Sequence, residues 1–327
     1  MKPIQSTLHP AVLAMLCVGL ASSVGLAHAS CGASFCTLMT DRYAQGVIDT
    51  HLGWSGDVRL EAVTQNKLRT GTSNIKPSEV TDEEAIERRT RNLNLLATVG
   101  YGFDRDWSVS VRIPVLKRDH VHNVIDEETG VAGERERWRY TRLGDVQVQA
   151  RRQFSAEGSA TSFALFGGVK LPTGTTRVTN GEGSRAERSL QPGTGTTDVV
   201  LGLAGRHVVN ATNALIGQAS VTQAVNSDEH FKPGRRSELS VGWSHAYSHG
   251  LGAVLQLNLR HRDRDRGAQA EPDNSGSTLL DLSPGITVGI GPASTLYAYV
   301  QVPVYQNVNG IQLVPRASFV LGWTADF

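Results

Sequence analysis

The sequence predicts an all-β protein, a closed antiparallel transmembrane β-barrel of about 12 strands in the outer membrane of a Gram-negative bacterium. Three observations support this fold class. The chain begins with a segment typical of a secretory signal. Beyond that segment, no apolar run approaches the roughly 20 residues of a membrane-spanning helix. Instead, apolar and polar residues alternate in many short segments, which are separated by alternately short and long connections.

The N-terminal segment has the features of a cleaved signal peptide. Lys2 precedes an apolar stretch over residues 11–26, and Ala27-His28-Ala29 forms a small-residue cleavage pattern ahead of Ser30. We therefore expect residues 1–29 to be removed during export. Gly and Ser residues within the apolar stretch make a retained membrane anchor the weaker alternative.

Two cysteines, Cys31 and Cys36, remain after the signal peptide is removed. In an oxidising periplasm this spacing predicts a small disulfide-closed loop. Lipidation of Cys31 is disfavoured by His28, and a soft-metal site would have only two ligands, too few for structural zinc. We expect residues 30–56 to form a periplasmic segment and residues 57–327 to form the barrel.

The expected strands are segments in which every second residue is apolar, which places one set of side chains against lipid and the other in the lumen. Leu93 and Leu95, for example, alternate with Asn92 and Asn94. The twelve expected strands lie near residues 58–62, 92–101, 107–115, 146–151, 163–171, 199–203, 215–222, 239–243, 253–260, 280–288, 296–302 and 317–327.

The connections between these strands alternate in length, as expected for short periplasmic turns, longer extracellular loops and periplasmic termini. The long segments are polar and charged, which is typical of solvated loops. Short turns are expected near residues 103–106, 155–159, 209–213, 248–250 and 291–294. Longer loops are expected near residues 67–88, 118–138, 172–195, 225–236 and 261–277, with a shorter one at 306–313.

The C-terminal strand resembles the signal by which outer-membrane barrels are recognised for assembly. Phe319, Leu321, Trp323 and the terminal Phe327 alternate with other residues to the end of the chain. The resemblance implies that the barrel-assembly machinery binds this strand.

Three further segments resemble those of the outer-membrane transporter-like family named for the meta-pathway of phenol degradation. They are Lys170-Leu171-Pro172-Thr173-Gly174, the segment 190–198 that begins Leu190-Gln191-Pro192-Gly193, and the segment 303–310 that begins Pro303-Val304-Tyr305. The resemblance spans residues 57–327. It implies passage of small, often aromatic or otherwise hydrophobic, molecules across the outer membrane, and it assigns no binding residue. The same Pro and Gly residues also have a structural interpretation, since they shape a loop that leaves one strand and re-enters the next.

The alternation also predicts which charged side chains face the lumen. The candidates lean basic: Arg112, Arg151, Lys170, Glu238, Arg260, Asp281 and Arg316. Because an isolated buried charge is costly, these groups either pair across the lumen or face water. Pairing predicts a plugged barrel, and hydration predicts a conduit with a slight preference for anions. The sequence is compatible with both.

Other function classes receive little support. With 32 basic and 31 acidic residues interspersed along the chain, nothing indicates nucleic-acid binding. Ser244 and His245 are adjacent and point to opposite faces of a strand, and the chain lacks a Gly-x-Ser-x-Gly motif. The histidines are interpreted as scattered, without metal-ligand spacing: His51, His120, His122, His207, His230, His249 and His261. We therefore expect neither an enzyme nor a cofactor.

The sequence thus predicts an outer-membrane channel for passive or gated passage of small, hydrophobic or aromatic organic solutes. Its expected partners are outer-membrane lipid, the assembly machinery and the solute. The alternative is a non-conducting barrel with a binding or structural role, whose Cys31–Cys36 end contacts a periplasmic partner.

Overall fold

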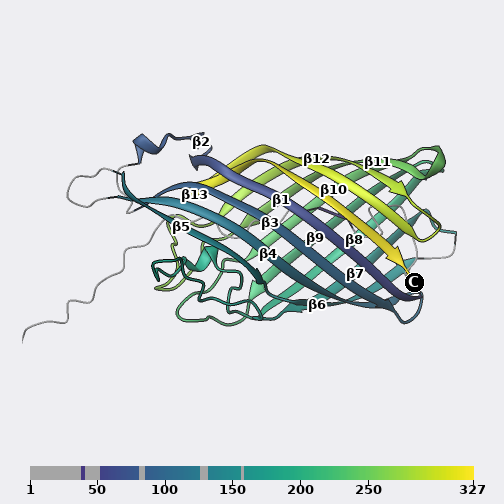
Figure 1. The fold of residues 1–327 in the computed structure, drawn as a ribbon. Coiled ribbons are helices and arrows are strands. Elements are labelled where there is room, and N and C mark those ends of the chain that lie inside the picture. Colours follow the sequence, from purple (N-terminus) through teal and green to yellow (C-terminus); the bar gives the residue numbers. More distant parts are fainter. Residues whose placement is uncertain (1–37, 41–51, 81–84, 126–131, 156–157) are drawn as a thin grey trace, which may run out of the picture.

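The computed structural model of the chain describes residues 38–40, 52–80, 85–125, 132–155 and 158–327. The expected signal peptide and the expected Cys31–Cys36 disulfide lie outside these residues. The described elements are β-strands joined by turns, loops and three short 3-10 turns (Figure 1).

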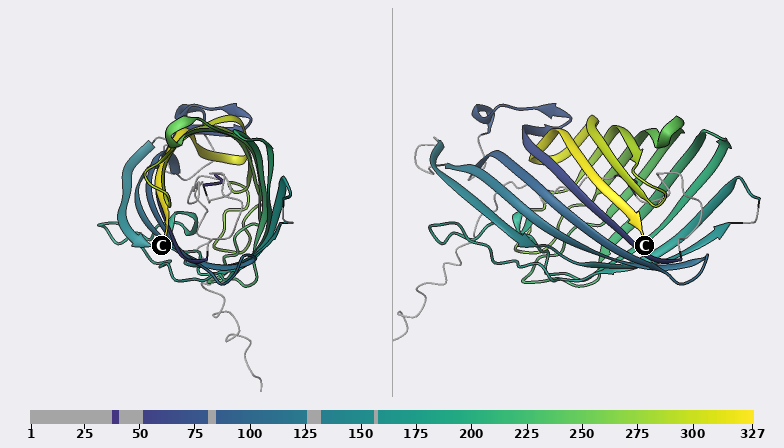
Figure 2. Two further views of the ribbon diagram at one scale, coloured as in Figure 1. Left: turned by 90° about the vertical axis from the view of Figure 1, so that its right-hand side faces the viewer. Right: turned by 45° about the vertical axis from the view of Figure 1, so that its right-hand side comes forward.

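One antiparallel sheet contains all of the strands and closes on itself through pairing of its first and last members (Figure 1). The strands are β1 (Gly53–Gly71), β2 (Ser73–Asn74), β3 (Ala85–Gly102), β4 (Trp107–Ile125), β5 (Ala132–Leu143), β6 (Gln147–Ser155), β7 (Thr161–Lys170), β8 (Asp198–Asn210), β9 (Asn213–Ala224), β10 (Arg236–Ala246), β11 (Leu251–Arg262), β12 (Ser277–Gly289) and β13 (Ser294–Asp326). The 3-10 turns are η1 (Pro77–Glu79), η2 (Arg188–Leu190) and η3 (Ser248–Gly250). Viewed along its axis, the sheet forms a ring (Figure 2, left).

The two faces of the sheet have opposite chemistry, in agreement with the alternation in the sequence. On the outer face, Leu201 and Leu203 are 62% and 53% exposed. On the inner face, Glu61 and Gln65 are 0% and 1% exposed. This arrangement is the reverse of a water-soluble protein and suits an apolar surrounding outside the ring.

Eleven strands form the closed path, compared with the expectation of about 12, and the last one supplies both arms that close the ring. Residues 295–308 of β13 pair with β12, and residues 308–326 pair with β1. Both pairings are antiparallel. In a closed ring with an odd number of strands, this is possible only if β13 itself reverses direction.

The chain reverses within β13 at Asn309-Gly310, where Gly310 has a φ of 56° that glycine adopts readily. Across the two arms, Gln306 Nε2 donates to the Pro315 carbonyl at 3.0 Å. The two strands expected at 296–302 and 317–327 are therefore one continuous element with a tight turn.

Two strands, β2 and β5, lie outside the closed path. β5 pairs with residues 115–125 of β4, whereas β6 pairs with residues 107–112 of the same strand. The two partners are separated by Gly144-Asp145-Val146, and β5 stands away from the ring (Figure 2, left). The long loop expected at 118–138 is therefore largely an extended β4–β5 hairpin.

The connections fall at two ends of the barrel. Short connections lie at the end that holds the C-terminus and the start of β1, and we call this the turn end (Figure 1). The longer connections lie at the opposite end, which we call the loop end. Among the described residues, no helix is long and apolar enough to span a membrane.

Candidate functional site

A cavity of about 400 Å³ lies inside the ring and is lined by residues from most of the barrel strands. Five of the side chains expected to face the lumen line it: Arg112, Arg151, Lys170, Glu238 and Arg260. Apolar side chains, including Leu96, Phe166 and Leu279, also line it. The cavity therefore offers both charged and apolar contacts to a small molecule.

The two other expected lumen residues have different surroundings. Asp281 is 5% exposed in β12 and does not line this cavity. Arg316 is exposed, next to a bulge at which Gln65 pairs with Pro315 and Lys67 pairs with Val314. Because the bulge interrupts the two-residue period, Pro315 lines the cavity and Arg316 does not.

The connection between β7 and β8, residues 171–197, folds over the cavity, and we call it the inward loop. Its residues Arg188, Gln191 and Thr194 are part of the cavity lining. On the inner wall, Arg118 donates to the Leu190 carbonyl at 2.6 Å, and the Tyr140 hydroxyl donates to the same oxygen. The inward loop is thus bound to the inner surface of the wall rather than extending away from it.

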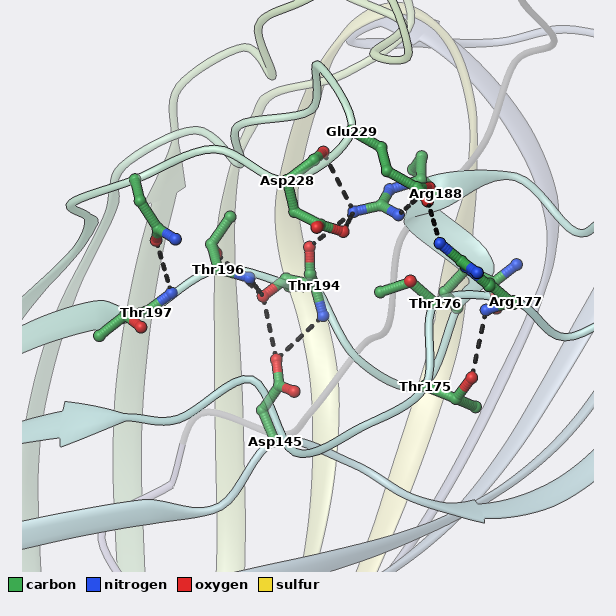
Figure 3. A network of polar contacts seen from close by, with 12 residues as sticks. Asp145, Thr175, Thr176, Arg177, Arg188, Thr194, Thr196, Thr197, Asp228 and Glu229 are labelled. Carbon is green, nitrogen blue, oxygen red and sulfur yellow. Dashed lines mark hydrogen bonds and ion pairs between the residues drawn. The ribbon is translucent and has the colours of Figure 1, made fainter.

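Asp145 holds both ends of the inward loop, and Figure 3 shows its contacts with Thr194 at the returning end. It lies in the break between β5 and β6, and its carboxylate accepts hydrogen bonds from the backbone N–H groups of Gly174 at 3.0 Å and Thr194 at 2.9 Å. The Thr194 hydroxyl donates to it at 2.9 Å, and Lys170 Nζ lies 2.7 Å away. Lys170 also donates to the Thr196 carbonyl at 3.0 Å. One ion pair therefore fixes where the loop leaves the wall and where it returns.

Two Gly residues of this region, Gly174 and Gly193, have a direct steric role. The two ends of the loop approach so closely that a Cβ added to Gly193 would lie 2.2 Å from the Gly174 carbonyl oxygen. Only glycine fits this approach without a backbone shift. The segments on which the family resemblance depends thus include the residues that close the base of the inward loop.

A second set of ion pairs joins the inward loop to the β9–β10 connection, residues 225–235 (Figure 3). Arg188 Nη2 lies 2.7 Å from Asp228 Oδ2, and its guanidinium carbon lies 5.1 Å from the centre of the Phe231 ring. Glu229 accepts from Arg177 at 2.7 Å and from Arg185 at 2.5 Å. These hydrogen bonds lower the pKa of Glu229 from 4.5 to about 2.

The short segment 38–40 lies in the lumen, inside the ring of strands (Figure 2, left). The side-chain amide of Gln256 bonds both the N–H and the carbonyl of Met39, at 3.0 and 2.8 Å. Met39 packs among buried residues of the wall that include Val63, Ile216 and Tyr297. This segment narrows the lumen. The sequence pattern did not indicate such a role for residues that precede the barrel strands.

The charges around the cavity are unequal. Eight basic side chains line it: Arg59, Arg112, Arg151, Lys170, Arg188, Arg236, Arg260 and Arg262. Four acidic ones do so: Asp57, Asp145, Asp198 and Glu238. Several of these form ion pairs, such as Arg59 with Glu61 at 2.8 Å and Arg236 with Glu238 at 3.6 Å. Three of the basic groups, Arg59, Arg188 and Arg262, pair with acidic side chains that do not line the cavity: Glu61, Asp228 and Asp265. The smaller excess of basic groups that remains would favour anions over cations within the lumen.

The C-terminal residues expected to form the assembly signal lie at the end of β13. Phe319, Leu321 and Phe327 are exposed on the outer face, and Trp323 is half-buried with its ring centre 6.4 Å from that of Phe327. The N–H of Phe327 donates to the Trp54 carbonyl at 2.9 Å, so the terminus is paired to β1.

One group of residues was missed by the sequence interpretation. His120 and His122, which were interpreted as scattered, lie together with Glu87 in a buried cluster beside the inward loop. The His-x-His spacing places both rings on one face of a strand, which is the signal that could have identified them. Their partner Glu87 is distant in sequence and follows only from the β3–β4 register.

The closed antiparallel ring, the apolar outer face and the polar lumen define a transmembrane β-barrel of the outer-membrane type. Comparison with solved structures supports this class. An outer-membrane channel from Pseudomonas putida F1 matches with a TM-score of 0.63 at 9% identity, over 86% of this chain and 98% of that chain. At this identity, the likeness shows the fold.

Other solved barrels superpose less closely. They include the toluene transporter TbuX of Ralstonia pickettii, with a TM-score of 0.45 and 7% identity over 85% of this chain and 90% of that one. A FadL homologue of Pseudomonas aeruginosa has a TM-score of 0.42 and 9% identity over 84% and 90%. No protein-family model and no curated protein sequence matches the chain.

Proposed function

We propose that this protein is a gated outer-membrane channel for small organic solutes that combine an apolar, often aromatic, body with a negative charge. The observation that carries the proposal is the lumen cavity of about 400 Å³, in which an excess of basic side chains lies beside apolar ones. The volume is of the size that accommodates a small organic molecule.

The gate in this proposal is the inward loop. Ala186 and Leu190 of the loop pack on Trp138 of β5. The polar contacts of the loop are hydrogen bonds and ion pairs, through Asp145 to the wall and through Arg188 to the β9–β10 connection. Such contacts can exchange with water, so displacement of the loop would not require unfolding of the barrel. We also propose that transport is passive, without a cofactor or an energy source. We place the loop end outside the cell and the turn end in the periplasm, as in other outer-membrane barrels.

The alternative, a non-conducting barrel with a periplasmic binding end, is less favoured. A purely structural barrel gives the charged cavity no evident role. Localisation in the outer membrane follows from the fold class; export through a cleaved signal peptide remains part of the proposal.

Uptake by proteoliposomes tests the proposed solute class. Purified protein in liposomes should admit benzoate several-fold faster than benzylammonium, because the two share an aromatic ring and differ in charge. Glucose should enter more slowly than benzoate. The double variant Arg112→Ala/Arg151→Ala should reduce the preference for benzoate.

Arg105→Ala is the matched control for that variant. Arg105 is exposed in the turn 103–106 and does not line the cavity, so its removal should leave the preference unchanged. Uptake no faster than in protein-free liposomes for every solute would contradict the channel and favour the alternative.

A further inference from the structure

Three side chains that can bind a metal converge in the wall near the loop end. Glu87 of β3 pairs in register with His122 of β4, and His120 lies two residues away on the same face. One ligand atom from each residue lies within 4.8 Å of the others. The distance from His120 Nε2 to Glu87 Oε1 is 3.7 Å, too long for a hydrogen bond.

The cluster lies beyond the apolar band of the barrel. On the outer face, the apolar residues Leu93 and Val115 are followed towards the loop end by the charged residues Arg91 and Lys117. The cluster is therefore at the level of the extracellular extension of the strands in the proposed orientation.

The ring nitrogens that face away from the cluster are bonded to neighbouring side chains. His120 Nδ1 is 2.8 Å from the Thr90 hydroxyl, and His122 Nε2 is 3.0 Å from Glu136 Oε2. A carboxylate or hydroxyl partner on the outer nitrogen is the usual arrangement of a metal-binding histidine, because it fixes the ring and its tautomer. In His120 it leaves Nε2 on the side of Glu87, 3.7 Å from Oε1.

The cluster is shielded from solvent. Glu87, His120 and His122 are all at most 2% exposed, and both carboxylate oxygens of Glu87 lack a hydrogen-bond donor among the described residues. Glu187 of the inward loop is a second carboxyl group, and it interacts electrostatically with Glu87. Arg118 opposes this charge, but it donates to Asn92 and to the Leu190 carbonyl. A carboxyl group buried without a donor is costly to ionise, and either a proton or a bound cation compensates its charge.

We propose that Glu87, His120 and His122 bind one divalent transition-metal ion, with Zn²⁺ as the ion that best matches two imidazoles and one carboxylate. Tetrahedral zinc places its ligand atoms about 3.3 Å apart, from bond lengths of about 2.0–2.1 Å. The observed 3.7 Å between His120 and Glu87 is close to that value, and modest side-chain rotation would close the remaining separations. The fourth ligand would be water or Glu187.

The ion would join the wall to the inward loop. His122 reaches Glu136 of β5, and Glu136 Oε1 accepts from the Ser184 hydroxyl of the loop at 3.0 Å. Trp138, whose ring centre is 4.8 Å from that of His122, donates to the Ser184 carbonyl at 2.9 Å. Metal binding would thus rigidify β3, β4, β5 and the loop together. The site is independent of whether the barrel conducts.

Zinc binding to the purified, chelator-treated full chain in detergent tests the proposal. Equilibrium dialysis against Zn²⁺ should give one ion per chain. Glu87→Gln and His120→Gln should each weaken binding at least about tenfold, since each removes a ligand. Glu136→Gln should weaken it about 10–100-fold by removing the partner of His122.

Two matched variants control for other sites. His261→Gln alters an exposed histidine that bonds Thr278, and it should bind zinc as the wild type does. Cys31→Ser/Cys36→Ser should also retain binding.

A spectroscopic readout reports on the site directly. Cu²⁺ should quench the fluorescence of Trp138, and the quenched component should be absent in Trp138→Phe and in Glu87→Gln. Folding of each variant is verified by its heat-modifiable migration. No zinc binding by folded wild type, binding unchanged in folded Glu87→Gln and His120→Gln, or binding lost only in the cysteine variant would each overturn the proposal.

Discussion

Asp145 shows how much of the lumen depends on one side chain. Its carboxylate accepts from the two ends of the inward loop and pairs with Lys170, so four donors share two oxygen atoms. The residue can do this because it lies in the break between β5 and β6, where its side chain is not directed by ladder pairing. The local irregularity of the wall is therefore what creates the anchor of the loop.

Glu229 provides a pH-dependent test at the residue scale. Hydrogen bonds from Arg185 and Arg177 lower its pKa from 4.5 to about 2. A carboxyl group whose pKa is depressed in the folded state stabilises the fold above its ordinary pKa. That contribution is lost as the pH falls from about 4.5 towards about 2. We expect the contact between the inward loop and residues 225–235 to persist at pH 5 and to weaken below pH 4.5.

Hydrogen–deuterium exchange of residues 176–188, corrected for the intrinsic rate at each pH, measures this contact. Glu229→Gln should exchange faster than wild type at pH 7 and should lose the acid-dependent increase. Glu182→Gln is the control, because Glu182 is exposed in the same loop and its side chain has no ion pair among those identified. Equal exchange in Glu229→Gln and wild type at pH 7 would contradict this role.

Individual site residues were predictable where the two-residue period is unbroken. Arg112, Arg151 and Glu238 could be assigned to the lumen because each lies in a regular strand. Arg316 could not, since the bulge near Pro315 reverses the period and no residue type announces it. Glu87 could not be linked to His120 and His122 because strand register is a long-range property.

At the scale of elements, β13 combines two arms of the barrel and brings them into contact. Gly322 of the second arm lies against Tyr297 of the first, and a Cβ at position 322 would be 2.2 Å from the Tyr297 ring. Tyr297 is 1% exposed and its hydroxyl donates to Asp57 Oδ2 at 2.7 Å. The small residue therefore allows an aromatic ring to cover the inner face of the closing arm.

We expect Gly322→Val to displace Tyr297 and to destabilise the barrel by about 1–3 kcal/mol, the usual cost of overpacking. Urea unfolding in detergent, followed by tryptophan fluorescence, measures the change. Gly217→Val is the matched control, since the nearest atom to a Cβ there is 3.8 Å away. Equal unfolding midpoints for the two variants would show that the contact with Tyr297 carries no strain.

The C-terminal strand is predicted to direct assembly. Phe327→Ala should lower the amount of folded protein in the outer membrane several-fold, because the terminal aromatic residue is part of the expected signal. Phe103→Ala is the control, as Phe103 is also an exposed aromatic residue of the turn end. Quantitative immunoblotting of outer-membrane fractions, with heat-modifiable migration as the measure of folding, gives the comparison. If the amount of folded Phe327→Ala protein equals that of the wild type, Phe327 is not part of the assembly signal.

The strands of the barrel wall were predictable from alternation, whereas the strands at its margins were not. The outer face of β5 carries Arg135, Arg137 and Arg139 rather than apolar residues, so the segment was interpreted as a loop. Trp138 and Tyr140 nevertheless alternate with these arginines and are buried on the inner face. A strand that extends beyond the lipid keeps the two-residue alternation, but its outward side chains are no longer apolar. It therefore cannot be recognised by alternating apolar residues.

For the whole molecule, the closed ring explains both halves of the sequence pattern. The apolar half contacts lipid, and the polar half lines a lumen that a loop and the segment 38–40 narrow. Fold class and membrane setting followed from the secretory signal, the two-residue period and the alternating lengths of the connections. The state of the lumen did not, because the inward loop is bound by contacts between residues far apart in the sequence.

Single-channel conductance in planar bilayers tests the central claim, that the inward loop restricts a passage through the barrel. The double variant Asp145→Ala/Lys170→Ala removes the anchor at both ends of the loop together with its basic partner. Asp198, which also pairs with Lys170 at 3.3 Å, keeps the hydrogen bond that it accepts from the Thr196 hydroxyl. It should conduct several-fold more than the wild type in the same salt. The control Arg105→Ala/Asp106→Ala also removes one base and one acid, from the turn end, and should match the wild type. If the anchor variant folds and conducts no more than the wild type, the claim is contradicted.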